Sequence, residues 1–502
     1  MPPNTSVMDR ELARTQAQAH RLTRRSLLQR AAGLGLAAST LGALELLAEL
    51  PDEALARGGG GLPEIQFQIE KRLPKPSKIE GVRVRFGPVY TLFVTIALAR
   101  TPDAADQTTL AQALGRVEQA YPFSPSGVFS TVAYGIPYFE RLPGGFAGSL
   151  VGEHMPRVAL EPERAALEEA VPGPTDVSPQ NPGITKQRFN IPVQIERNDM
   201  LLTLRSDSSE ILEDVLSWLT EADTTLAGVD AGASGLGELL QVTSRRLMFV
   251  EQGLPRSIAQ AQGLPYAEMV NPASPMWMGF VSQQLSSSGP PAIVTFLGNS
   301  AAKLTTARRG DYFDHGSIQH LSHVIQDLEQ FYERPGETYE RREAEMFSAD
   351  PLPRSANQDP YTNGGGPAVV ESVFAGAQQA EREAEGANNF DGQPHIAHTS
   401  ALQRTSRAQN RTPMHIRADG PGYDTLDVPD GSSQPKLHFS IFVPTAQFFA
   451  TMRRSQASLD LAQKYSVPQS NLGLERFLTA TRRQNFLVPP RRHRSFPLVE
   501  LG

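Results

Sequence analysis

The sequence predicts an α+β protein with two ferredoxin-like lobes, each an antiparallel sheet with packed helices. Segments rich in β-branched and aromatic residues are followed by single segments in which apolar residues have helical spacing. This alternation occurs in both halves of the chain. Strands that alternate with single helices in this way are typical of the β-α-β-β-α-β unit.

The first half contains three predicted strands and two predicted helices. A strand over 90–98 precedes a helix over 108–118, and further strands are expected over 127–136 and 199–204. The helix after the last strand has five apolar residues on one face: Ile211, Leu212, Val215, Leu216 and Leu219. Its N-cap is expected to be Ser206, Asp207 or Ser208, because short polar side chains accept hydrogen bonds from the first backbone amides of a helix.

The second half repeats this pattern around a long insertion. A strand over 317–324 leads into a helix with Leu328 and Phe331, and a strand over 436–443 leads into a helix over 446–453. We therefore expect an N-terminal lobe over 85–250, a C-terminal lobe over 251–485 and a tail over 486–502. Residues 350–392 are rich in Pro, Gly, Asn and Gln, which predicts a partly disordered insertion.

The amino terminus resembles a twin-arginine export signal. Arg24 and Arg25 precede an apolar run over 31–44, and Ala54-Leu55-Ala56 has the small-x-small pattern of a cleavage site. The alternative is a short buried helix. The apolar run is shorter than the roughly 20 residues that span a bilayer, so no stable membrane span is expected. We predict a signal over 1–56, a linker over 57–84, use of the twin-arginine export machinery, and a periplasmic, cell-surface or extracellular location.

Composition excludes several classes of partner and cofactor. The chain has 47 basic and 54 acidic side chains, a net charge of −7, so no global positive field favours nucleic acid. It has no cysteine, which excludes disulfides, thiolate zinc, iron-sulfur clusters and covalent c-type haem. A metal would have to bind His, carboxylates, Tyr or Met. Homo-oligomerisation stays open.

Three segments are similar to dye-decolourising peroxidases. They are Arg197–Asp207, Gly316–Tyr332 and Leu437–Phe442, and the similarity extends patchily over roughly residues 85–485. The resemblance implies two ferredoxin-like lobes in a dimeric α+β barrel-like arrangement. It also implies non-covalent haem b, with hydrogen peroxide and a small-molecule reductant such as a bulky phenol or dye as reaction partners.

The family's haem has a histidine ligand on one side and an arginine on the other. His398 and Arg417 are 19 residues apart, which is close to the family spacing. The resemblance therefore assigns His398 as the iron ligand, Arg417 as the distal arginine, and Leu437 and Phe439 on the following strand as cofactor-binding residues. An arginine stays charged and suits a place where negative charge develops on a peroxide oxygen.

Other histidines are alternatives to this assignment. His395 and His398 have the i, i+3 spacing of a metal pair, and His415 lies in a string that also looks like the family's ligand region. His315, His320 and His323 are interpreted as structural. His320 and His323 are predicted to point to opposite faces of one strand.

The chain departs from the family at the distal aspartate. The family's Gly-x-x-Asp-Gly motif is best matched over 279–283, where Ser282 stands in the aspartate position and Gln283 in that of the second glycine. A neutral hydroxyl is a poor base, so a contribution of roughly 100- to 10,000-fold from general-base catalysis would be largely missing. Alternatively, Gly279 and Phe280 form a plain turn.

These observations lead to one functional hypothesis and two alternatives. The first is an exported b-type haem protein that oxidises bulky substrates with peroxide, weakened by the loss of the aspartate. The second is a non-catalytic protein that binds or stores haem. The third is a haem-free exported scaffold or binding protein.

Overall fold

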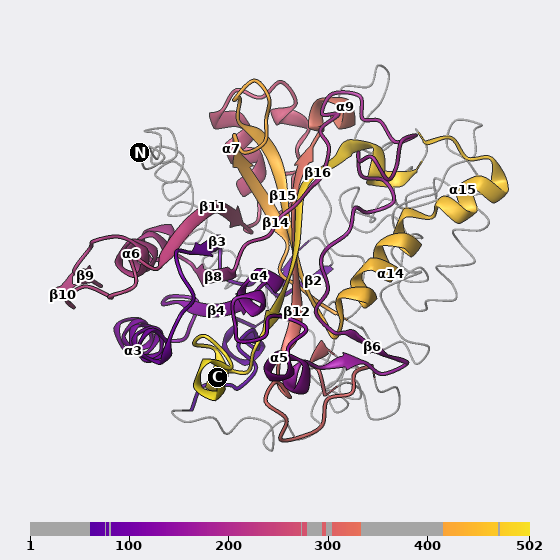
Figure 1. The fold of residues 1–502 in the computed structure, drawn as a ribbon. Helices are drawn as coiled ribbons and strands as arrows, with labels where there is room; N and C mark the ends of the chain where they lie inside the picture. The colour runs from indigo at the N-terminus through magenta and orange to yellow at the C-terminus, as the bar shows by residue number, and fades with distance from the viewer. Residues whose placement is uncertain are drawn as a thin grey trace, which may run out of the picture.

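The computed structural model describes residues 61–75, 77–79, 82–272, 274–278, 294–297, 304–332, 415–469 and 472–502. Its central feature is a ten-stranded sheet that runs through the middle of the molecule (Figure 1). All strand pairs in this sheet are antiparallel except β7 (Gln194–Ile195), which is parallel to β16 (Leu478–Val488). The predicted signal, the 350–392 insertion, His395, His398, Ser282 and Gln283 lie outside the described residues.

The first half of the chain forms four strands of this sheet in the spatial order β11-β3-β8-β4. Along the chain the four strands are β3 (Tyr90–Leu98), β4 (Phe129–Tyr134), β8 (Met200–Ser206) and β11 (Leu240–Phe249). Their spatial order is therefore fourth, first, third and second. Helix α3 (Ala104–Ala120) follows the first strand and α6 (Ser209–Thr220) follows the third. This is the ferredoxin-like arrangement.

The second half repeats the arrangement, with the order β16-β12-β15-β13. Its strands are β12 (Ser317–Gln326), β13 (Ile416–Arg417), β15 (Gln434–Val443) and β16. Helix α9 (Leu328–Tyr332) follows the first strand, and α14 (Ala446–Ala457) and α15 (Leu459–Tyr465) follow the third. The predicted α+β class with two ferredoxin-like units is therefore confirmed.

The two units form one continuous sheet, which corrects the barrel-like part of the prediction. Strands β4 and β16 join them through the pair Tyr134 and Leu487. Among the described residues, the edge strands β11 and β13 do not pair, so the sheet is open. It nevertheless curls, because β14 (Gly420–Asp424), which pairs with β15, lies beside β11. A Cβ on Gly420 would stand 2.5 Å from Val250 Cγ2, so the absence of a side chain at Gly420 allows β14 to lie this close to the end of β11.

The two faces of the sheet have different environments. One face packs its alternating side chains, such as Leu92, Val94 and Leu202, into the main core with helices α3, α6 and α14. We call this the helix face. The opposite face, here the inner face, has a smaller apolar cluster that includes Phe93, Leu321 and Phe486, together with a large set of polar side chains.

Local sequence signals explain where the helices begin. Helix α3 starts before the predicted position because Asp103 and Asp106 form a capping box, in which each side chain accepts from the other's backbone amide. For α6, Ser208 is the N-cap and accepts from the Ile211 amide, so one of the three predicted candidates is confirmed.

Short elements complete the described chain. They are η2 (Glu70–Arg72), β1 (Ser77–Ile79), β2 (Val82–Val84), α4 (Ile136–Glu140), α5 (Ser149–His154), β5 (Arg157–Val158), β6 (Glu161–Ala165), β9 (Thr225–Leu226), β10 (Val229–Asp230), α7 (Leu254–Ala261), η3 (Ala267–Met269), η5 (Gly473–Phe477), η6 (Arg491–His493) and η7 (Val499–Leu501). None of the helices in the described ranges is both long and apolar enough to cross a membrane.

Candidate functional site

Three of the predicted site residues lie on the helix face of the second unit. Arg417 in β13 pairs with Ile441 of β15, so the two side chains leave the same face of the sheet. Leu437 and Phe439 stand at alternate positions of β15 before Ile441 and therefore share that face. Arg417, Leu437 and Phe439 therefore lie on the same face of the sheet, with Phe439 two and Leu437 four residues before the partner of Arg417 on β15. We call this surface the Arg417 face.

Arg417 is a mostly buried cation beside a carboxylate. Its side chain is 19% exposed, and Nη1 lies 3.9 Å from Asp419 Oδ2. Leu437 and Phe439 are both half-buried. A mostly buried guanidinium can attract an anionic oxygen more strongly than it would in bulk solvent.

Helix α14 covers the adjoining part of this face. Phe449 of α14 stacks on His320 with a ring-centroid distance of 3.8 Å, and it lies 6.0 Å from the Phe439 ring. Thr445 caps the helix by accepting from the Phe448 amide, which fixes where α14 begins. In Figure 1, α14 and α15 lie together on one side of the central sheet.

His320 belongs to the helix face but has no free ring nitrogen. Its Nδ1 lies 2.7 Å from Asn485 Oδ1 and its Nε2 lies 2.6 Å from Ser322 Oγ. Arg483 donates to the same Ser322 oxygen, so the hydroxyl proton is directed at His320 Nε2 and Nδ1 carries the ring proton. Burial lowers the pKa of His320 well below its usual value, and the nearby positive charge of Arg483 lowers it further. This bonding agrees with a structural role.

A buried ion network connects helix α14 to the segment before β16. Arg453 donates to both carboxylate oxygens of Glu475, and Thr175 also donates to Glu475. Burial alone would raise the pKa of Glu475, but Arg453 reverses this effect and the pKa falls well below its ordinary range. The network fixes α14 to the segment that leads into β16.

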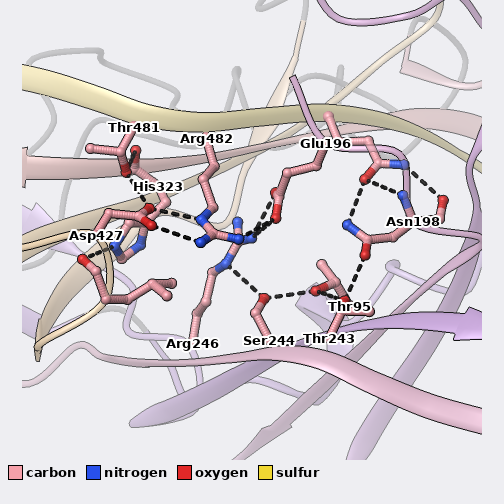
Figure 2. A network of polar contacts seen from close by, with 12 residues as sticks. Thr95, Glu196, Asn198, Thr243, Ser244, Arg246, His323, Asp427, Thr481 and Arg482 are labelled. Atoms are coloured by element: carbon pink, nitrogen blue, oxygen red, sulfur yellow. Dashed lines mark hydrogen bonds and ion pairs between the residues drawn. The ribbon is translucent and has the colours of Figure 1, made fainter. Parts of the chain in front are cut away.

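The inner face carries a separate network that joins the two units (Figure 2). Arg246 of β11 donates to both oxygens of Glu196, and Arg482 of β16 reaches Glu196 at 3.2 Å. Arg482 also donates twice to Asp427, at 2.7 Å each, and Thr481 donates to the same carboxylate. The charged groups are therefore paired, as buried ions must be.

Beside this network, two histidines meet on the inner face. His323 of β12 and His438 of β15 are direct cross-strand partners, with Nδ1 atoms 3.2 Å apart. Burial lowers the pKa of both imidazoles, so each is neutral at pH 7. Asp424 at the end of β14 lies 3.4 Å from His438 Nε2. His320 and His323 thus point to opposite faces, as their spacing predicts.

The remaining predicted site residues cannot be placed in this geometry. His398, His395, Ser282 and Gln283 lie outside the described residues, and their roles stay predictions. His415 is described and buried, two residues before Arg417. Of the predicted site residues, only the arginine and the two apolar residues have a described position, on the same face of the sheet.

The sequence interpretation missed the ionic residues of the inner face, among them Arg246, Glu196, Asp424 and His438. Each lies in or beside a strand, but their partners are distant in the chain. The one available signal was the alternation of Lys436, His438 and Ser440 on one side of β15, which marks a polar face.

The described part of the Arg417 face carries the kinds of side chain that one side of a haem site needs. Arg417 supplies a permanent cation, and Leu437 and Phe439 supply half-buried apolar surface for a flat ring. His320 cannot supply an iron-binding nitrogen because both of its nitrogens are already hydrogen-bonded.

The chain belongs to DUF7405, a family of unknown function whose model matches residues 88–171 and 166–490. No curated protein matches it. Among solved structures, a DyP-type peroxidase from Cellulomonas bogoriensis is similar, with 14% identity, a TM-score of 0.48, and coverage of 83% of this chain and 94% of that one. A dye-decolorizing protein from Vibrio cholerae has 14% identity and a TM-score of 0.42, and the match covers 86% of this chain and 98% of that one. A DypB variant from Rhodococcus jostii in complex with heme has 12% identity and a TM-score of 0.46, with 82% and 96% covered.

Proposed function

We propose that this protein binds haem b non-covalently at the Arg417 face and uses it for slow, peroxide-dependent oxidation of bulky phenolic or dye-like substrates. The observation that supports the proposal most is the shared face of Arg417, Leu437 and Phe439, since these three residues were assigned to the cofactor from the sequence motifs alone. The cross-strand register supports this by putting their side chains on the same face of the sheet.

When bound, haem would supply the iron-centred redox chemistry, and the chain's own residues would control charge and water. Leu437 and Phe439 would exclude water from the ring. Arg417 would hold an anionic oxygen by charge-assisted hydrogen bonds. His398 is the proposed iron ligand, and it would need a hydrogen-bond acceptor at its other nitrogen to fix its tautomer.

The proposed arrangement has no strong base to accept the proton of the peroxide. Arg417 has no acceptor atom, so it cannot take that proton. Ser282 stands where the family has an aspartate and is a poor base near neutral pH. Asp419 lies beside Arg417 and is the nearest described carboxylate on its own segment, so it is the alternative acceptor.

A second function follows from the same substitution. A protein that lacks the distal base can bind haem without catalysing peroxide-dependent oxidation. Non-catalytic haem binding or storage is therefore the alternative function. We further propose export by the twin-arginine route, which would release the protein into the periplasm, onto the cell surface or outside the cell. This part rests on Arg24 and Arg25 before the short apolar run.

The test is steady-state dye oxidation by the full chain after incubation with haem and removal of the excess. The proposal predicts hydrogen-peroxide-dependent activity above that of free haem, lowered at least tenfold in Arg417→Leu. Arg454→Leu, in the exposed half of α14, is a matched control that should keep the activity. Haem binding without any peroxide-dependent activity would favour the storage function.

A further inference from the structure

The histidine pair on the inner face leaves one outer ring nitrogen without a hydrogen bond. The two Nδ1 atoms of His323 and His438 lie 3.2 Å apart, and His323 Nε2 lies 3.4 Å from the Leu426 carbonyl oxygen. His438 Nε2 faces the carboxylate of Asp424, with Oδ2 3.4 Å away, and the two atoms do not form a hydrogen bond of normal geometry.

The two facing atoms are both buried and unpartnered. Among the described residues, neither His438 Nε2 nor Asp424 Oδ2 has a hydrogen-bond partner, and the His438 side chain is 0% exposed. Each of the two atoms therefore carries the penalty of a buried polar group without a hydrogen-bond partner. A cation between these atoms would remove both penalties.

The backbone of Gly422 lies close to this nitrogen. A Cβ on Gly422 would stand 2.3 Å from His438 Nε2, so any side chain at this position would block the nitrogen. The separation of 3.4 Å agrees with two ligands of a tetrahedral ion, because metal bonds of about 2.0–2.2 Å give ligand separations of about 3.3–3.6 Å. The Asp424 side chain is 25% exposed, which offers a route from solvent.

The neighbouring lysine is compatible with this site. Lys436 Nζ donates to the Leu426 carbonyl at 2.7 Å and lies 3.6 Å from Asp424 Oδ1. It therefore approaches the oxygen that also accepts from the Leu426 amide and leaves Oδ2 to face His438. Such an outer contact orients a ligating carboxylate.

We propose that His438 Nε2 and Asp424 Oδ2 bind one divalent first-row transition-metal ion, such as Zn²⁺ or Co²⁺. His323 is the positioning residue, because its Nδ1 accepts the His438 Nδ1 proton and so keeps Nε2 free for the metal. One potential ligand atom from each of His323, Asp424 and His438 lies within 4.8 Å of the other two. An imidazole with a carboxylate favours such ions over Mg²⁺ and Ca²⁺.

The remaining coordination positions suit water or a small anion. Six charged side chains lie around the site, three cations and three carboxylates: Arg246, Lys436, Arg482, Glu196, Asp424 and Asp427. A divalent ion adds positive charge to this balanced set, so a hydroxide or small carboxylate would be the preferred further ligand. The site lies on the opposite face from Arg417 and does not depend on haem.

The test is a Co²⁺ titration of the full chain after chelator treatment, followed by visible absorption. We expect one saturable Co²⁺ site, lost in His438→Gln and in Gly422→Ala, and weakened about 10- to 100-fold in His323→Gln, the usual range for an outer-shell residue. His493→Ala, which removes a histidine outside the cluster, and a His395→Ala/His398→Ala double variant should both retain the site. The last variant separates this proposal from the haem proposal.

Two results would overturn the metal site. The first is a wild-type protein with no saturable Co²⁺ absorption, which would leave the cluster as a hydrogen-bonded network only. The second is an unchanged Co²⁺ site in His438→Gln. If the variants do not fold, X-ray absorption of the Zn²⁺-loaded double variant decides, because a spectrum without imidazole scattering would contradict His438 as a ligand.

Discussion

Arg246 and Glu196 form a buried ion pair at the junction of the two units, with Arg246 Nη2 2.6 Å from both carboxylate oxygens. The two side chains are 0% and 5% exposed. Arg482 of β16 reaches the same carboxylate, so Glu196 bridges a strand of the first unit and a strand of the second. The pair therefore holds together the face on which the metal site is proposed.

Glu196→Gln should be strongly destabilising, because it leaves the Arg246 charge buried without a counter-ion. We expect the free energy of unfolding to fall by about 3–5 kcal/mol. The matched control is Glu140→Gln, which removes the exposed pair with Arg197 and should cost at most about 1 kcal/mol. Urea unfolding followed by circular dichroism measures both. Equal effects would show that Glu196 contributes no more than a surface charge.

Stability should decline in acid partly through Glu475. Its folded pKa lies well below the unfolded value of roughly 4.3 because Arg453 outweighs burial. The unfolded chain therefore binds the proton first as pH falls, so this contribution is complete above the unfolded pKa and is lost below it. Melting temperatures between pH 7 and pH 3 should fall less steeply in Glu475→Gln than in wild type. Parallel curves would exclude this linkage.

Restoring the missing base should accelerate the peroxide reaction. Ser282→Asp combined with Gln283→Gly should raise the rate of hydrogen peroxide consumption by the haem-loaded protein by about tenfold or more, given the usual contribution of a positioned base. Stopped-flow mixing measures the rate. A fast wild type whose rate does not change would place the proton transfer elsewhere, with Asp419 as the next candidate.

Export should depend on the arginine pair. Replacing Arg24 and Arg25 by lysine should leave the precursor inside the cell, because the export machinery recognises the arginine pair of the signal. Cell fractionation with an antibody against the mature chain shows where it resides. Replacing Arg10 and Arg14 by lysine provides the control and should not alter export. Normal export of the Arg24 and Arg25 variant would reject the twin-arginine assignment.

The sequence predicted most of the first-unit strands and the helices that follow them, because their apolar patterns are local. Strand β11 was missed because Ser244 and Arg246 interrupt its pattern, and β16 was missed because Arg482, Arg483 and Gln484 make it look exposed. These polar side chains are buried only because distant partners neutralise them, for example Asp176 for Arg483. The secondary-structure propensity of a residue carries no information about the distant ion-pair partner that it will meet in the fold.

The same limit applies to the sites. Arg417, Leu437 and Phe439 were predicted from motifs, and the register places them on one face. The convergence of His438 with Asp424 was not predicted, because it depends on β14 and β15 pairing in one register. A single histidine in a strand gives no sign of the strand that will lie next to it.

Haem titration of the full chain tests the central claim most directly. The account predicts a saturable haem absorption band at one haem per chain, abolished or strongly shifted in His398→Ala, with an unchanged far-ultraviolet circular dichroism spectrum. His395→Ala and His415→Ala should keep the band. A wild-type chain without a saturable band would contradict haem binding altogether. A band retained in His398→Ala but lost in one of the other two variants would contradict the assigned ligand.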